Sequence, residues 1–199
     1  MDSLKPDKEL PSFERIILKL QKRKDGKGWP FNTGILGISI NAGLVGLVSN
    51  SYFRRMLKVR KLLLFTSLPM VVIPAISILP MWTMYVAKPI VEGDLSCDIC
   101  AQMRGAALNV TFGLLYPCFV SIPLVASIAL RYKTVDIPKV GFSKEVFLKQ
   151  MKFWSEKSRF FKSQFISLAF FQFVVGMYIA HKQYVVAQEF VHKPNIFGK

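Results

Sequence analysis

The uncharged stretch GAALNVTFGLLYPCFVSIPLVASIAL, residues 105–130, decides what kind of fold this chain can adopt. It separates Arg104 from Arg131 by 26 residues that include no Asp, Glu, Lys or Arg. A bilayer core of about 30 Å is crossed by about 20 helical residues, because each residue adds about 1.5 Å. The stretch is therefore long enough to cross a membrane as one helix, with room for tilt.

Three similar runs occur elsewhere in the chain. Residues 28–53 and 62–87 each hold 26 residues without a charge, and residues 163–180 hold 18, near the lower limit for a span. If these runs were core helices of a soluble protein, the rest of the 199-residue chain would be too short to cover them. The runs are continuous rather than alternating, which disfavours a β-barrel.

We predict an all-α polytopic membrane protein with four proline-kinked transmembrane helices and amphipathic helices at the membrane surface. The charged residues that give the formal net charge of +15 lie between and on either side of the uncharged runs. The predicted membrane domain covers residues 31–180, with spans at about 31–53, 62–87, 105–130 and 163–180. The flanking segments are a polar basic N-terminal part with a short amphipathic helix (1–30), an amphipathic basic segment (143–162) and a C-terminal tail (181–199).

Prolines interrupt two of the runs. Pro69, Pro74 and Pro80 fall in the second run, and Pro117 and Pro123 fall in the third. An interior proline removes a backbone donor and kinks a helix. Broken helices can mark transporter sites, but ion pathways need ionisable groups in the membrane, and none of the runs contains an acid or a base. We therefore interpret the kinks as architectural.

Small residues are concentrated in the first run. They form two overlapping pairs at four-residue spacing, a pattern that lets helix backbones approach closely. Asparagines in the same run would seek hydrogen-bond partners on another helix. The alternative is that glycine is simply common in membrane helices. We predict helix packing or partner contact through Ser39, Asn41, Ala42, Gly43, Gly46 and Asn50.

Basic residues indicate the orientation. Five Lys/Arg crowd into residues 54–61 and nine lie in 131–162, whereas the loop at 88–104 has two against three acids. By the positive-inside rule we place 54–61 and 131–162 inside, although the basic N-terminus argues the other way. Because no nucleic-acid motif accompanies these charges, we expect no nucleic-acid partner. We predict contact with anionic lipid or with a partner through Arg54, Arg55, Lys58, Lys149, Lys152 and Lys157.

Cys97 and Cys100 form a C-x-x-C motif just before the third run. A thioredoxin-like centre would need a βαβ context, and His181 and His192 do not match a usual zinc spacing. A local disulfide and two free thiols remain the open alternatives, and we predict the disulfide if the loop faces an oxidising compartment. No catalytic set is evident, so we expect no enzyme activity, metal or cofactor.

Five strings in order resemble the transmembrane protein 126 family. They span residues 49–141, and the G-D-L-x-C-x-x-C string is closer to the A-type paralogue than to the B-type. The strings are SNSYFRRMLKV (49–59), SLPMVVIP (67–74), GDLSCDIC (93–100), LYPCFVSIPL (115–124) and ALRYKTVDIPKVG (129–141).

This resemblance implies a multi-pass protein of the mitochondrial inner membrane that assists assembly of respiratory complex I. It implies a non-enzymatic scaffold for membrane-arm intermediates, with membrane-arm subunits, other assembly factors and the inner-membrane insertase as partners. Loops 54–61 and 131–162 would then face the matrix. Two other hypotheses remain: a small transporter or channel, and a thiol-redox membrane protein that uses Cys97 and Cys100.

Overall fold

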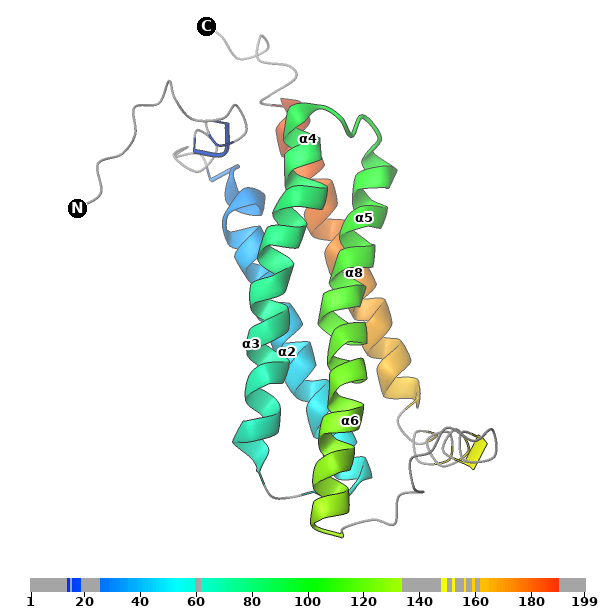
Figure 1. Cartoon of the computed structure of the whole chain (residues 1–199). Coiled ribbons are helices and arrows are strands. Elements are labelled where there is room, and N and C mark those ends of the chain that lie inside the picture. Colours follow the sequence, from blue (N-terminus) through cyan, green and yellow to red (C-terminus); the bar gives the residue numbers. More distant parts are fainter. Residues whose placement is uncertain are drawn as a thin grey trace, which may run out of the picture.

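In the residues that it describes, the computed structural model of the chain consists of helices joined by short turns and loops, with no strand. Figure 1 shows long helices lying side by side in one bundle, as predicted from the uncharged runs. The described residues are 14, 16–18, 26–59, 62–133, 148–149, 152, 156, 159 and 162–189.

Four continuous helical rods make up the bundle, and each is long and apolar enough to cross a membrane. The first rod is α2 (Thr33–Met56), preceded by the short 3-10 turn η1 (Trp29–Phe31). The last is α8 (Lys162–Ala187). The second rod joins α3 (Leu63–Trp82), η2 (Thr83–Ala87) and α4 (Lys88–Glu92). The third joins α5 (Asp98–Val110), η3 (Thr111–Leu115) and α6 (Tyr116–Arg131).

The rods extend beyond the spans predicted from sequence. The third rod begins at Asp98 rather than near residue 105, and α8 continues past His181 to Ala187. A charged residue marks where a chain leaves the hydrocarbon layer, but it does not interrupt the backbone hydrogen bonds of a helix. The predicted amphipathic segments lie mostly outside the described residues, although 14, 16–18, 148–149, 152 and 156 are helical.

Two π-helical turns occur in the second and third rods. Residues 83–87 and 111–115 widen the helix immediately before Pro89 and Pro117. A proline lacks its N–H and its ring crowds the carbonyl four residues earlier, and local widening relieves that clash. Both rods therefore continue through these prolines, with the π-helical turns as local widenings.

The two most extensive helix contacts are those of α2 with α3 and of α5 with α8. The α5–α8 crossing depends on Gly105 and Gly176. A Cβ on Gly176 would sit 2.6 Å from the carbonyl oxygen of Gly105, and one on Gly105 would sit 2.7 Å from the Cβ of Ala180. Only glycine permits this approach of two backbones.

Different helix ends and loops lie at the two ends of the bundle. The start of α2, the α4–α5 loop and the end of α8 lie at one end, at the top of Figure 1, which we call the terminal end. The α2–α3 turn, the end of α6 and the start of α8 lie at the other, which we call the turn end. Trp82 is fully buried toward the terminal end, where its Nε1 donates to Gln183 at 3.0 Å.

Candidate functional site

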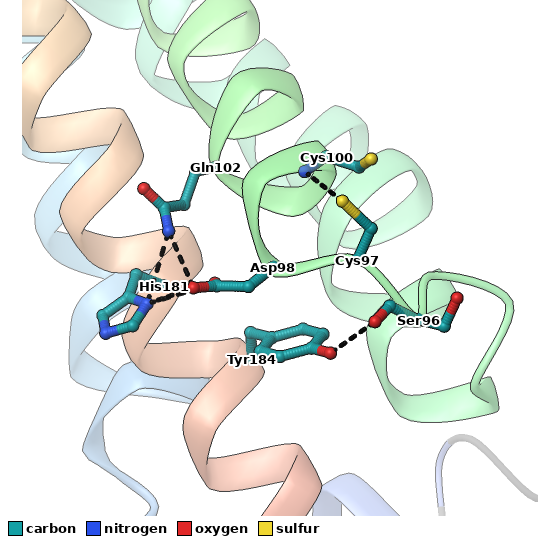
Figure 2. Close-up of polar contacts among 7 residues, drawn as sticks. All are labelled: Ser96, Cys97, Asp98, Cys100, Gln102, His181 and Tyr184. Carbon is teal, nitrogen blue, oxygen red and sulfur yellow. Dashed lines mark hydrogen bonds and ion pairs between the residues drawn. The ribbon is translucent and has the colours of Figure 1, made fainter.

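The C-x-x-C motif begins α5 at the terminal end (Figure 2). Cys97 has extended backbone angles and is the N-cap of the helix. Its Sγ accepts a hydrogen bond from the backbone N–H of Cys100 at 3.2 Å. The thiol therefore satisfies one of the N–H groups that a helix start leaves without a partner.

This position lowers the pKa of the Cys97 thiol. The main cause is a hydrogen bond with the Cys100 side chain, followed by the bond from the Cys100 backbone, whereas the charge of Asp98 opposes the shift. A helix N-terminus also favours a thiolate. Both cysteines are exposed free thiols in the structure. The local disulfide between them stays a prediction.

A hydrogen bond beside the motif joins α5 to α8. His181 Nδ1 lies 2.9 Å from Asp98 Oδ2. The Gln102 amide donates to the same oxygen at 2.9 Å, and its nitrogen lies 3.4 Å from His181 Nδ1. Since Nδ1 faces a carboxylate, it carries the proton, and Gln102 donates to Asp98 rather than to the ring. The pair is partly exposed, so it orients two helices more than it stabilises them.

The loop that carries the cysteines is held on both sides. The Tyr184 hydroxyl on α8 donates to the Ser96 carbonyl at 2.6 Å (Figure 2). The backbone N–H of Leu95 donates to the Pro89 carbonyl at 3.1 Å, and the Leu95 side chain is buried. Contacts from α4 and α8 thus fix the loop, so the motif starts α5 from a defined position.

Sequence reasoning found the cysteines but missed their neighbours. His181 and Tyr184 lie three residues apart on α8, which puts them on one helix face, and this spacing was the available signal. Their partners lie more than 80 residues earlier, at Asp98 and Ser96, and no local pattern encodes that pairing. Among the described residues, no group of three or more His, Cys, Asp or Glu is placed to hold a metal ion. The chemistry available at this site is therefore the Cys97 thiol, whose pKa is lowered, next to the Cys100 thiol.

The small residues of the first span lie against α3. Ser39 Oγ donates to the Ala75 carbonyl at 2.6 Å, and a Cβ on Gly43 would lie 3.1 Å from the Val71 carbonyl. Asn50 is buried and donates to Thr66 and Ser67, at 3.2 and 3.0 Å. Ala42 and Gly46 are also buried. This stripe is an internal interface, so it leaves no free face for a partner.

Asn41 lies on the same helix but contacts α8. Its amide donates to Gln172 Oε1, and the amide of the buried Asn109 on α5 donates to the Gln172 carbonyl at 2.7 Å. Gln172 thus joins three helices through polar bonds inside the predicted membrane region. Among described residues, Asn109 Oδ1 and Gln172 Nε2 have no hydrogen-bond partner.

The predicted lipid-contact residues divide into two groups. Arg54 is buried at the end of α2, whereas Arg55 and Lys58 are exposed beside it. All three line an open cavity at the turn end. Lys149 and Lys152 are exposed, and Lys157 lies outside the described residues.

The chain is similar to known membrane proteins along most of its length. A family model described as Transmembrane protein 126 matches residues 12–196. Transmembrane protein 126A of Mus musculus is 31% identical over 177 residues, which is 89% of this chain and 80% of the relative. Transmembrane protein 126 of Drosophila melanogaster is 32% identical over 164 residues, 75% of this chain and 73% of the relative.

Another mouse (Mus musculus) protein, more distantly related to this chain, is named Complex I assembly factor TMEM126B, mitochondrial. It is 26% identical over 108 residues, which is 54% of this chain and 46% of its own. No solved structure matches the chain. The family match covers nearly the whole membrane bundle, and identity is higher to the 126A proteins than to the 126B protein, as the sequence strings predicted. The chain belongs to the transmembrane protein 126 family.

Proposed function

We propose that this chain is a non-enzymatic assembly factor of the mitochondrial inner membrane that holds membrane-arm intermediates of respiratory complex I. The single observation that carries the proposal is its membership of a family that includes a relative named as a mitochondrial complex I assembly factor. Its four apolar rods fit such a role, because an assembly factor has to meet apolar subunits inside the bilayer.

The outer face of α8 is our candidate for the holding surface. Only 22% of the most apolar window of α8 is buried, against 50% for α2. Exposed large side chains follow one another along the helix: Ile166, Phe170, Phe171, Val174 and Tyr178. Helices associate in lipid through side-chain packing, and this row offers large side chains to a partner helix. The small-residue stripe of α2 is unsuitable, since α3 already covers it.

The proposal includes an orientation and a set of partners. The turn end would face the matrix, because loops 54–61 and 131–162 carry the basic excess. Membrane-arm subunits of complex I, other assembly factors and the inner-membrane insertase would be the partners. Exposed Lys149 and Lys152 would meet matrix-side parts of those proteins.

Gene deletion followed by native gels of solubilised mitochondria tests this function. We expect less assembled complex I and an accumulation of membrane-arm intermediates, and both should recover when the wild-type chain is restored. Normal complex I in the deletion strain would refute the proposal. Rescue by Phe170→Ala should be weaker than rescue by Phe119→Ala, a matched control on α6, since the two rings are 69% and 74% exposed.

The lowered pKa of the Cys97 thiol supports a second candidate function, that of a thiol-redox membrane protein. A redox protein would lose all rescue when Cys97 and Cys100 are replaced together by Ser. A scaffold should keep most of it, because neither thiol is buried. The same native-gel assay therefore separates the two functions.

A further inference from the structure

An open cavity of about 730 Å³ lies at the turn end, where α2 turns into α3. It lies away from the cysteine motif, which belongs to the terminal end. Its walls combine cations with apolar and hydroxyl groups. The lining residues are Ser51, Arg54, Arg55, Lys58, Val59 and Leu63.

Hydrogen bonds hold the inner wall of this cavity in place. Arg54 is 5% exposed, and its guanidinium donates to Thr66 Oγ1 at 2.9 Å and to the Leu62 carbonyl at 3.4 Å. Asn50 donates to the same Thr66 hydroxyl at 3.2 Å. The buried arginine is therefore oriented by α3 before any ligand arrives, which lowers the entropy cost of binding.

The charge of this end favours an anion. No Asp or Glu occurs anywhere from residue 26 to residue 91. The sequence of α2, the turn and α3 therefore contains basic residues and no acidic ones. At the terminal end, Lys27 pairs with Glu189 at 2.7 Å and Lys88 pairs with Glu92 at 3.9 Å. Guanidinium and ammonium groups clustered in this way suit a phosphate.

The surface next to the cavity is strongly apolar. The first turn of α3 exposes Leu63, Leu64 and Phe65, and the last two are 77% and 65% exposed. The turn connects two rods that are each long enough to span a bilayer, so the cavity lies at the level where head groups meet acyl chains. A free phosphate would use only the cations, whereas a phospholipid would use both surfaces.

We propose that the α2–α3 turn binds an anionic phospholipid, with its phosphate against Arg54, Arg55 and Lys58 and its acyl chains over Leu64 and Phe65. The site is independent of what the outer face of α8 holds. The proposed ligand of this end of the bundle is a phosphodiester that has a net negative charge and hydrocarbon tails.

Lipid binding to the full chain in detergent, followed by native mass spectrometry, tests the site. The probes are phosphatidylglycerol, phosphatidylcholine and inorganic phosphate. We expect phosphatidylglycerol to bind well above phosphatidylcholine. Arg55→Gln with Lys58→Gln should weaken phosphatidylglycerol binding about 25-fold, since each cation near a lipid surface contributes about fivefold. The matched control, Lys27→Gln with Lys88→Gln at the terminal end, should change binding less than twofold.

Two further outcomes keep the proposal falsifiable. Leu64→Gln with Phe65→Gln should weaken phosphatidylglycerol binding while leaving the helix content by circular dichroism unchanged. Equal binding of the two lipids, or equal losses in the paired and control variants, would overturn the site. Inorganic phosphate that displaces phosphatidylglycerol at matched concentration would show a free-anion site and overturn the lipid assignment.

Discussion

Replacing Gly176 by Ala should destabilise the bundle more than its single added methyl group suggests. The new Cβ would lie 2.6 Å from the Gly105 oxygen, 2.8 Å from the Ala106 Cα and 2.9 Å from the Gly105 carbon. All three atoms are backbone, so no side chain can rotate away. Ordinary van der Waals contact of a Cβ begins at 3.4 Å, so α8 has to move away from α5 by roughly 0.8 Å to restore it, and overpacking of this kind costs about 1–3 kcal/mol.

The matched control is Gly37→Ala on the exposed face of α2, where an added Cβ meets nothing within 4 Å. There the substitution removes backbone freedom from the unfolded chain and should stabilise the helix by about 0.5–1 kcal/mol. Thermal unfolding in detergent, followed by circular dichroism, measures both variants. At about 2 kcal/mol, Gly176→Ala should lower the midpoint by about 4–8 °C. Equal midpoints for the two variants would refute the close approach of α5 and α8.

Three other perturbations give separate checks. Gln172→Leu removes the side-chain oxygen that accepts from Asn41 and the longer bond from Asn109 at 3.3 Å, although Asn109 keeps its bond to the backbone carbonyl of residue 172. The change should cost about 1–3 kcal/mol, and an unchanged unfolding midpoint would contradict the three-helix network. Leu62 has φ +56° at the start of α3, so Leu62→Gly should stabilise the chain by about 1 kcal/mol in the same assay, and destabilisation would contradict this strained turn. Iodoacetamide labelling against pH should show Cys97 reacting at lower pH than Cys100, because the pKa of Cys97 is lowered, and Cys100→Ala should move the Cys97 profile upward, so an unmoved profile would contradict the stated cause.

Hydrophobicity alone predicted the number and order of the helical rods, because a span needs only a long uncharged run. It predicted spans and not helix ends, since the ends of α5 and α8 depend on caps such as Cys97 and on contacts such as that of His181 with Asp98. These contacts join residues distant in sequence, and no local period encodes them.

The small-residue stripe of the first span was also visible in the sequence, but its partner was not. Ser39 and Gly43 show that some helix approaches closely, yet any of the other three rods could have fitted there. The polar partners of Asn41 and Asn50 were equally hidden, because one finds Gln172 on α8 and the other finds Thr66 on α3. The three-dimensional packing of the four rods determines which helix covers the stripe and which side chains the two asparagines meet.

The glycine crossing of α5 with α8 has a consequence for the order in which the chain is made. The α2–α3 pair can close as soon as both helices have entered the membrane, since only a short turn separates them. Gly105 on α5 must wait for Gly176, which leaves the ribosome 71 residues later. Until α8 arrives, α5 stands in the bilayer without its main neighbour, and Trp82 lacks the acceptor that Gln183 supplies. The last helix therefore completes the bundle, and a chain cut short before residue 162 loses the main neighbour of α5, although α6 keeps its contacts with α2 and α3.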